Sequence, residues 1–160
     1  MLNAPQLKWL WLSALTIVLD QASKLAVAKG MDLYHSIPII PYFNLTYMRN
    51  TGAAFSFLSE AGGWQRWFFA VLAIIISTVI SVWLTRLKNY ETLLAIALSL
   101  VLGGAIGNLI DRLAYGYVID FLDVYYKQWH WPAFNIADSA IVLGVVLMVL
   151  ESFQNNNANA

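Results

Sequence analysis

The chain has 160 residues, of which 60% are hydrophobic and 11% are charged. Soluble domains are about a quarter charged, so this composition excludes an ordinary soluble domain and indicates that the protein resides in lipid. The formal net charge is zero at pH 7, which does not point to nucleic acid or an acidic polymer as a partner, and the absence of cysteine excludes disulfides and thiol chemistry.

Four apolar stretches are long enough to cross a bilayer as helices. A span needs roughly 20 residues, because the hydrocarbon core is about 30 Å thick and each helical residue rises about 1.5 Å. The sequence therefore predicts one integral membrane domain over residues 1–160, with a polar tail that is expected to be disordered from about 154 to 160. The spans are expected at residues 9–27, 67–84, 93–110 and 136–153.

The first span has some features of a cleavable secretory signal. Lys8 precedes the apolar run, and the segment 26–28 resembles a small-x-small cleavage site. Asp20 and Lys24 interrupt the apolar core, and three more spans follow, which favours a retained helix. Because these two residues are four apart, they face the same side of the helix and are expected to neutralise each other.

About 38 residues connect the first two spans. The part HSIPIIPYFNLTYMRN is rich in β-branched and aromatic residues, which predicts short strands. The following TGAAFSFLSEAGGW is apolar but too short to span, so a segment lying along the membrane interface is expected. Gly52, just after Asn50, permits a tight turn that would direct backbone donors toward a bound peptide.

The lengths of the connections place both long ones on one side of the membrane. The link TRLKNYE between the second and third spans is short, whereas about 25 residues separate the third and fourth. Arg86 and Lys88 in the short link and Lys8 near the N-terminus indicate that this side is cytoplasmic, although the longer side also carries basic residues.

The third span carries small residues in GGAIGN, which predict a narrow face for close helix packing. Asn108 and Asp111 lie at the end of this span, where the helix dipole disfavours a carboxylate, so capping does not explain Asp111. The neighbouring Arg112 is expected to supply a counter-charge in a structural polar cluster.

Four of the nine acids lie at similar depth on the side of the long connections. Because the spans are antiparallel, the ends that carry them converge, and a carboxylate in hydrocarbon must be paired or hydrated. One of the four, Asp138, also forms an N-x-x-D helix-start signal with Asn135. The four acids are Asp20, Asp111, Asp120 and Asp138.

Asp120 is expected in the loop after the third span, in the apolar and aromatic segment YGYVIDFLDVYY, a setting that raises the pKa of a carboxyl group. If Asp120 and Asp138 approach closely, they can share one proton and activate a water molecule for attack on a peptide carbonyl. Serine–lysine chemistry through Ser23 and Lys24 is disfavoured, because neighbours on a helix point in different directions.

The sequence disfavours a transporter and a metal enzyme, and it leaves a non-catalytic adaptor as an alternative to a peptidase. A transporter should carry its acids near mid-membrane, often in repeats, whereas these acids cluster at one end. A non-catalytic adaptor would use the same polar cluster only to hold helices together. His35 and His130 have no metal-ligand motif around them, so neither a metal nor another cofactor is expected.

Five motifs together resemble the lipoprotein signal peptidase family, signal peptidase II of bacteria. They occur in the family's order over almost the whole chain, and none departs from the family pattern at a position that the family's mechanism uses. Each is weak alone, but the set is highly specific. The motifs are LDQASK, RNTGAAFS, GGAIGNLIDR, VIDF and FNIADS.

The resemblance implies an all-α membrane protein with four transmembrane helices, a small extracytoplasmic β-structured cradle and a short interfacial helix. It implies a bacterial inner membrane location with cytoplasmic termini, an active site near the periplasmic face, and Asp120 and Asp138 as catalytic residues. The implied supporting positions are Asp20, Lys24, Asn50, Gly52, Asn108, Asp111, Arg112, Asn135 and Ala137.

The implied substrate is a prolipoprotein whose lipobox cysteine carries diacylglycerol. Cleavage on the amino side of that cysteine follows from the resemblance, as does inhibition by the cyclic peptide globomycin. Membrane lipid is the other implied partner, and a monomer is expected.

Overall fold

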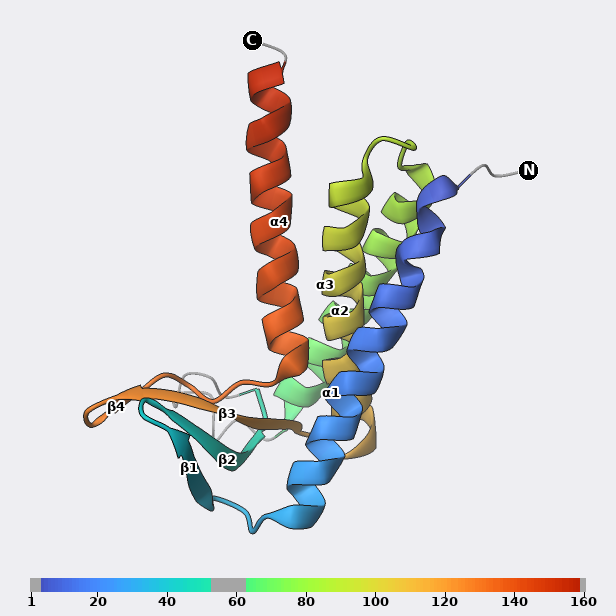
Figure 1. Cartoon of the computed structure of the whole chain (residues 1–160). Helices are drawn as coiled ribbons and strands as arrows, with labels where there is room; N and C mark the ends of the chain where they lie inside the picture. The colour runs from blue at the N-terminus through green and yellow to red at the C-terminus, as the bar shows by residue number, and fades with distance from the viewer. Residues whose placement is uncertain (1–3, 53–62, 159–160) are drawn as a thin grey trace.

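The protein consists of four long helices and a small sheet that projects from one end of them (Figure 1). A computed structural model describes residues 4–52 and 63–158, with side chains as far as residue 154. In chain order the elements are η1 (Pro5–Trp9), α1 (Leu10–Gly30), β1 (Ser36–Ile40), β2 (Phe43–Asn50), α2 (Trp64–Arg86), α3 (Thr92–Ala114), β3 (Val118–Tyr126), β4 (Trp129–His130) and α4 (Ile136–Ala158).

Each of the four long helices is apolar and long enough to cross a membrane, which confirms the four predicted spans. Both chain ends lie at the end of the helices that is remote from the sheet (Figure 1). The predicted boundaries are a few residues short, and α4 continues as far as Ala158. The helix therefore continues past its apolar part into residues 154–158, which the sequence predicts to be disordered.

α3 is the central helix and packs against each of the other three. A Cβ added at Gly103 would lie 2.8 Å from the Thr16 side chain of α1, and one added at Gly104 would overlap the backbone of Ala137 in α4. The glycines thus permit close helix approach, as the sequence predicts. The outward faces of α2 and α4 carry many exposed apolar side chains, as lipid contact requires.

The four strands form a sheet with the order β1-β2-β3-β4 and antiparallel pairing throughout. This confirms the predicted strands in the first connection. Asp120 was expected in a loop, but it lies in β3, opposite Met48 of β2. The segment VIDFLDVYY pairs along β2 because its β-branched and aromatic side chains suit a strand. The predicted interfacial segment after Gly52 falls largely on residues 53–62, outside the described residues.

The two faces of the sheet have different environments. Tyr47, Ile119 and Phe121 pack with Val27 at the end of α1 and bury one face. β3 is irregular at its centre, where the amides of Phe121 and Leu122 both donate to the carbonyl of Phe134. The register of β2 against β3 also shifts between Leu45 and Met48, where β2 has one residue more than β3.

Candidate active site

A buried ion cluster joins α1 to α3. The Lys24 ammonium lies 2.8 Å from an Asp20 oxygen and 3.0 Å from an Asp111 oxygen, and all three side chains are at most 1% exposed. The expected pairing of Asp20 with Lys24 is confirmed. The counter-charge of Asp111 is Lys24 and not the predicted Arg112, because the Lys24 ammonium of α1 lies 3.0 Å from the Asp111 carboxylate at the end of α3.

The two acids of this cluster also accept hydrogen bonds from backbone groups of other elements. Asp20 accepts from the amide of Ala137 in α4 at 2.9 Å, and Asp111 accepts from the amide of Ile119 in β3 at 3.0 Å. Gln21, which sequence reasoning missed, donates to Asp111 at 2.8 Å. The cluster therefore fixes the starts of α4 and β3 relative to α1 and α3.

Asn108 connects the ion cluster to Asp138. Its Oδ1 accepts from Lys24 Nζ at 2.9 Å and from Asn135 Nδ2 at 3.2 Å, while its Nδ2 donates to Asp138 Oδ1 at 2.7 Å. Since Lys24 and Asn135 only donate to Oδ1, the amide of Asn108 is oriented with its NH₂ group toward Asp138.

Asn135 contacts both acids of the predicted dyad. Its Oδ1 accepts from the amide of Asp138 at 2.9 Å, and its own amide donates to Asp138 Oδ2 at 3.2 Å, which confirms the predicted helix-start signal. Its Nδ2 donates to Asp120 Oδ1 at 2.7 Å. The side chain of Asn135 thus bridges Asp120 of β3 and the start of α4.

Asp120 is 2% exposed and accepts a second bond, at 3.0 Å, from Asn50 of β2. Burial and the charge of Asp138 raise the pKa of Asp120, the bonds from Asn50 and Asn135 oppose this rise, and the net pKa is about 7. A carboxyl group with this pKa exchanges its proton near neutral pH, as a general acid or base must.

Arg112 and Gly52 support the site from its edge. Arg112 donates to the carbonyl of Asn108 at 3.2 Å and lies over the ring of Phe69, 5.3 Å from its centre. The amide of Gly52 donates to Asn50 Oδ1 at 2.9 Å, and its φ of 95° favours glycine. This turn confirms the predicted tight turn and holds the Asn50 amide toward Asp120.

Two cavities reach the acids. A cavity of about 240 Å³ contains Asp120 in its wall together with Asn50, Thr51 and Met48. An apolar cavity of about 560 Å³ runs along α4 from Asp138, and its wall includes Trp131 and Val142. The cavity at Asp120 thus contains polar side chains, whereas the groove that begins at Asp138 is apolar.

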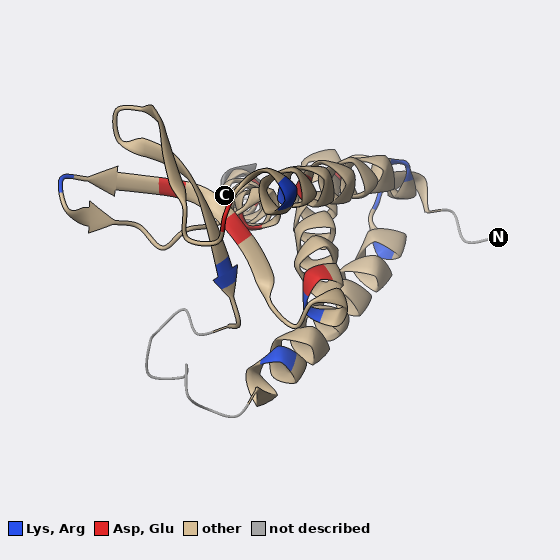
Figure 2. Cartoon of the chain, turned by 90° about the horizontal axis from the view of Figure 1, so that it is seen from below, with Lys and Arg blue, Asp and Glu red and all other residues tan. Residues whose placement is uncertain are grey.

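Other sequence interpretations are not supported by the contacts. Ser23 donates to the carbonyl of Asp20, and Lys24 is held by two carboxylates, so the pair is not arranged as a serine nucleophile with a lysine base. The acids lie at the sheet end of the helices (Figure 2). A transporter is expected to carry such acids near mid-membrane instead.

The fold and the site define a multi-pass membrane protein with a buried polar centre at one end of its helices. The family profile described as "Signal peptidase (SPase) II" matches residues 12–154. The chain belongs to this family.

Curated relatives agree with this assignment. A protein of Alteromonas mediterranea named "Lipoprotein signal peptidase" is 54% identical over 94% of this chain and 83% of that protein. One of the same name from Pseudomonas fluorescens is 55% identical over 94% of this chain and 89% of that protein.

Two solved structures share the fold. Both are described as bacterial membrane enzymes studied by the in meso method. The first has a TM-score of 0.84 and 31% identity and covers 96% of this chain and 92% of that chain. The second has a TM-score of 0.80 and 33% identity and covers 90% and 91%, respectively.

Proposed function

We propose that the protein is an aspartyl endopeptidase that removes the signal peptide from diacylglyceryl-modified prolipoproteins, on the amino side of the lipobox cysteine. Asp120 and Asp138 are the catalytic residues of this proposal. The observation that carries it is the side chain of Asn135, which bonds Asp120 through Nδ2 and the start of α4 at Asp138 through Oδ1. Family membership supports the same conclusion.

In the proposed mechanism the two carboxyl groups share one proton. The ionised group takes a proton from water, while the protonated group donates to the peptide carbonyl oxygen, which stabilises the tetrahedral intermediate. That intermediate collapses when the leaving nitrogen receives a proton from the acid that took it from water. Asn108 orients Asp138, and Asn50 and Asn135 orient Asp120, so each acid keeps its position through both steps.

The remaining predicted site residues act at a distance from the peptide bond. Lys24, Asp20 and Asp111 hold the helix ends together, and the amide of Ala137 ties α4 to Asp20. Arg112 and Gly52 stabilise Asn108 and Asn50, respectively. We infer that these residues position the two acids and do not themselves contact the scissile bond.

The apolar cavity along α4 suits the lipid part of the substrate. It begins at Asp138 and continues beside Val142, Leu143 and Val146 toward the middle of the helix. An acyl chain lodged there would keep the modified cysteine, and the bond before it, close to Asp138. This placement explains why a membrane-anchored substrate is cleaved by acids at the end of a helix bundle.

A test of the function compares one precursor with and without the diacylglyceryl group, using purified protein in detergent and gel mobility as readout. We expect the unmodified precursor to be cut with a kcat/KM about 100-fold lower, because burial of even four methylenes contributes about 3 kcal/mol. Equal rates for the two forms would contradict lipid recognition, and no cleavage of either form would contradict the proposed function.

The pKa of Asp120 leads to a prediction about pH. As the pH rises through about 7, Asp120 loses its proton and the pair no longer holds a shared proton, so kcat/KM is expected to fall on the alkaline side. Asn50→Ala removes a hydrogen bond that lowers this pKa, so the alkaline limb should move to higher pH. Asn44→Ala, on the same strand but bonded to Asp123, should leave the limb in place. An unmoved limb in Asn50→Ala would count against Asp120 as its origin.

We further propose that the protein lies in the bacterial inner membrane with both termini in the cytoplasm and the acid pair near the periplasmic face. Lys8, Arg86 and Lys88 support this orientation, since they belong to the end of the helices where both termini lie (Figure 1). Inhibition by a globomycin-type cyclic peptide is part of the same proposal and rests on the family resemblance.

A further inference from the structure

A further cavity lies farther out on the sheet and is not used by the proposed mechanism. Its volume is about 380 Å³, and its wall contains the side chains of Asp123 and His130. Asp123 is 6% exposed and accepts bonds from His130 Nδ1 at 2.8 Å and Asn44 Nδ2 at 3.0 Å. Thr46 lies beside it, at 3.5 Å, and pairs with Ser36 at 2.7 Å. A buried carboxylate with this many donors indicates a built site.

This outer cavity adjoins the one that contains Asp120. Met48, Pro132 and Ala133 line both cavities. The irregularity of β3 at Phe121 and Leu122 explains why Asp120 and Asp123 lie on the same side of the sheet. In a regular strand, residues 120 and 123 would face opposite sides, but both line cavities on this side, because β3 is irregular at Phe121 and Leu122 and its register against β2 shifts there.

The pairing with β2 shows the same alignment. Alternate residues of β2 contact the acids of β3, with Asn50 bonded to Asp120 and Asn44 bonded to Asp123. Met48 lies between these two contacts along β2, in the wall that both cavities share. One face of the sheet therefore carries two separate acids, Asp120 and Asp123, each bonded to an asparagine of β2.

The chemistry of the outer cavity is set by His130. A carboxylate oxygen accepts, so Nδ1 of His130 carries the hydrogen in its bond to Asp123. In a neutral imidazole the other nitrogen, Nε2, is then an acceptor, and among the residues that the structure describes none bonds it. The His130 side chain is 51% exposed, so an incoming group can reach it. The site thus offers acceptors and a carboxylate charge, which suit a donor or a cation.

We propose that Asp123 and His130 form a specificity subsite for a cationic or hydrogen-bond-donating side chain of the precursor, in the segment that follows the lipidated cysteine. This proposal rests on the proposed function. The signal segment is apolar and enters the membrane, so the polar groups of Asp123 and His130 suit the other side of the cleavage site. Asp120 and Asp123 are three residues apart, or about 10 Å along a strand, so an extended peptide reaches the subsite about three residues beyond the bond.

The test uses lipidated precursors that carry Lys, Ala or Asp at the second, third or fourth position of the mature segment. For the wild-type protein we expect kcat/KM to be about tenfold higher with Lys than with Asp at one of these positions, as one charge-assisted contact predicts. His130→Ala and Asp123→Asn should bring this ratio to within about twofold. Both variants should cut the Ala precursor at the wild-type rate.

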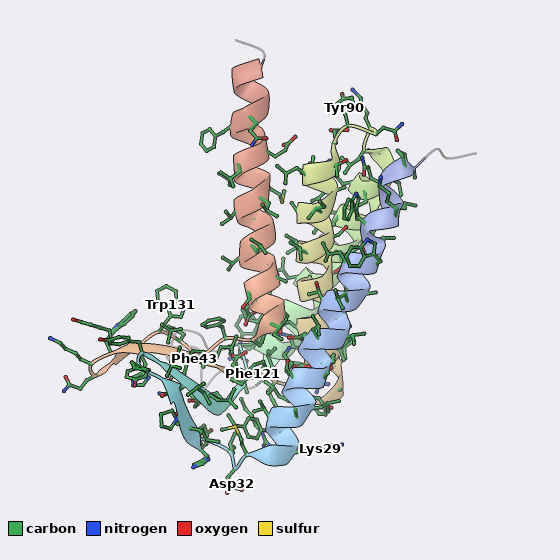
Figure 3. The ribbon with its side chains drawn as sticks, viewed as in Figure 1. Lys29, Asp32, Phe43, Tyr90, Phe121 and Trp131 are labelled. Atoms are coloured by element: carbon green, nitrogen blue, oxygen red, sulfur yellow. The ribbon has the colours of Figure 1, made fainter. Side chains whose placement is uncertain are left out.

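Asp32→Asn is the matched control, because it removes an acid that is not in the wall of the outer cavity. Asp32 is exposed at the turn after α1, whereas Trp131 of the cavity wall lies on the α4 side of the sheet (Figure 3). This variant should keep the wild-type ratio. The subsite is refuted if the wild-type protein does not discriminate, if both cavity variants keep the ratio, or if they lose the Ala precursor as well. A cavity that instead binds a lipid headgroup would make all precursors respond alike to lipid composition. If the wild-type protein cuts no lipidated precursor, the failure belongs to the proposed function.

Discussion

Asp120→Asn and Asp138→Asn are each expected to lower kcat for a lipidated precursor by about 10³-fold or more, because each removes a group that must gain and lose a proton. Asparagine has nearly the same shape as aspartate and keeps one oxygen to accept from Asn135 or Asn108. The loss should therefore arise from chemistry and not from unfolding. Single-turnover cleavage in detergent measures it.

The stability of the same variants separates a peptidase from an adaptor. Asp120 is buried, and the charge of Asp138 opposes its ionisation, so Asp120→Asn removes a repulsion while it loses one of the two hydrogen bonds that Asp120 accepts. We expect the free energy of unfolding to change by about 1 kcal/mol or less. An adaptor whose acids only hold helices together should instead lose assembly. Retained cleavage in either variant would remove that residue from the proposed pair, and Asp32→Asn serves as the control for loss of an acid.

Lys24→Met is expected to destabilise the protein strongly. Methionine has a similar length, but it leaves the Asp20 and Asp111 carboxylates buried without their common cation. Removal of one partner from a buried ion pair costs about 3–5 kcal/mol, which should appear as a large fall in the thermal midpoint in detergent. Cleavage should fall as well, because Lys24 also holds Asn108, which orients Asp138.

Two further variants test whether charge is the cause. Lys29→Met makes the same substitution in the last turn of α1, where the side chain is exposed, and should change stability by about 0.5 kcal/mol or less. Adding Asp111→Asn to Lys24→Met removes one of the two stranded carboxylates, so the double variant should be more stable than Lys24→Met alone. A double variant as unstable as the sum of its parts would assign the effect to packing.

The sequence determined the features that depend on local spacing and on the solvent. The four spans follow from apolar stretches that match the thickness of a bilayer. The pairing of Asp20 with Lys24 follows from their separation on a helix, and the start of α4 follows from Asn135 and Asp138, because each relation lies within one turn. The strand in the first connection was also visible from its β-branched and aromatic residues.

Only the tertiary structure decided which distant groups meet. The partner of Asp111 is Lys24 rather than its neighbour Arg112, and the site of Asp120 is a strand rather than a loop. Likewise, no spacing in the sequence indicates that His130 binds Asp123, or that a strand irregularity turns Asp123 toward the side of Asp120. Such contacts depend on the rotation of each helix about its axis and on the register of each strand. These are set by packing between segments far apart in the chain, which local periodicity does not encode.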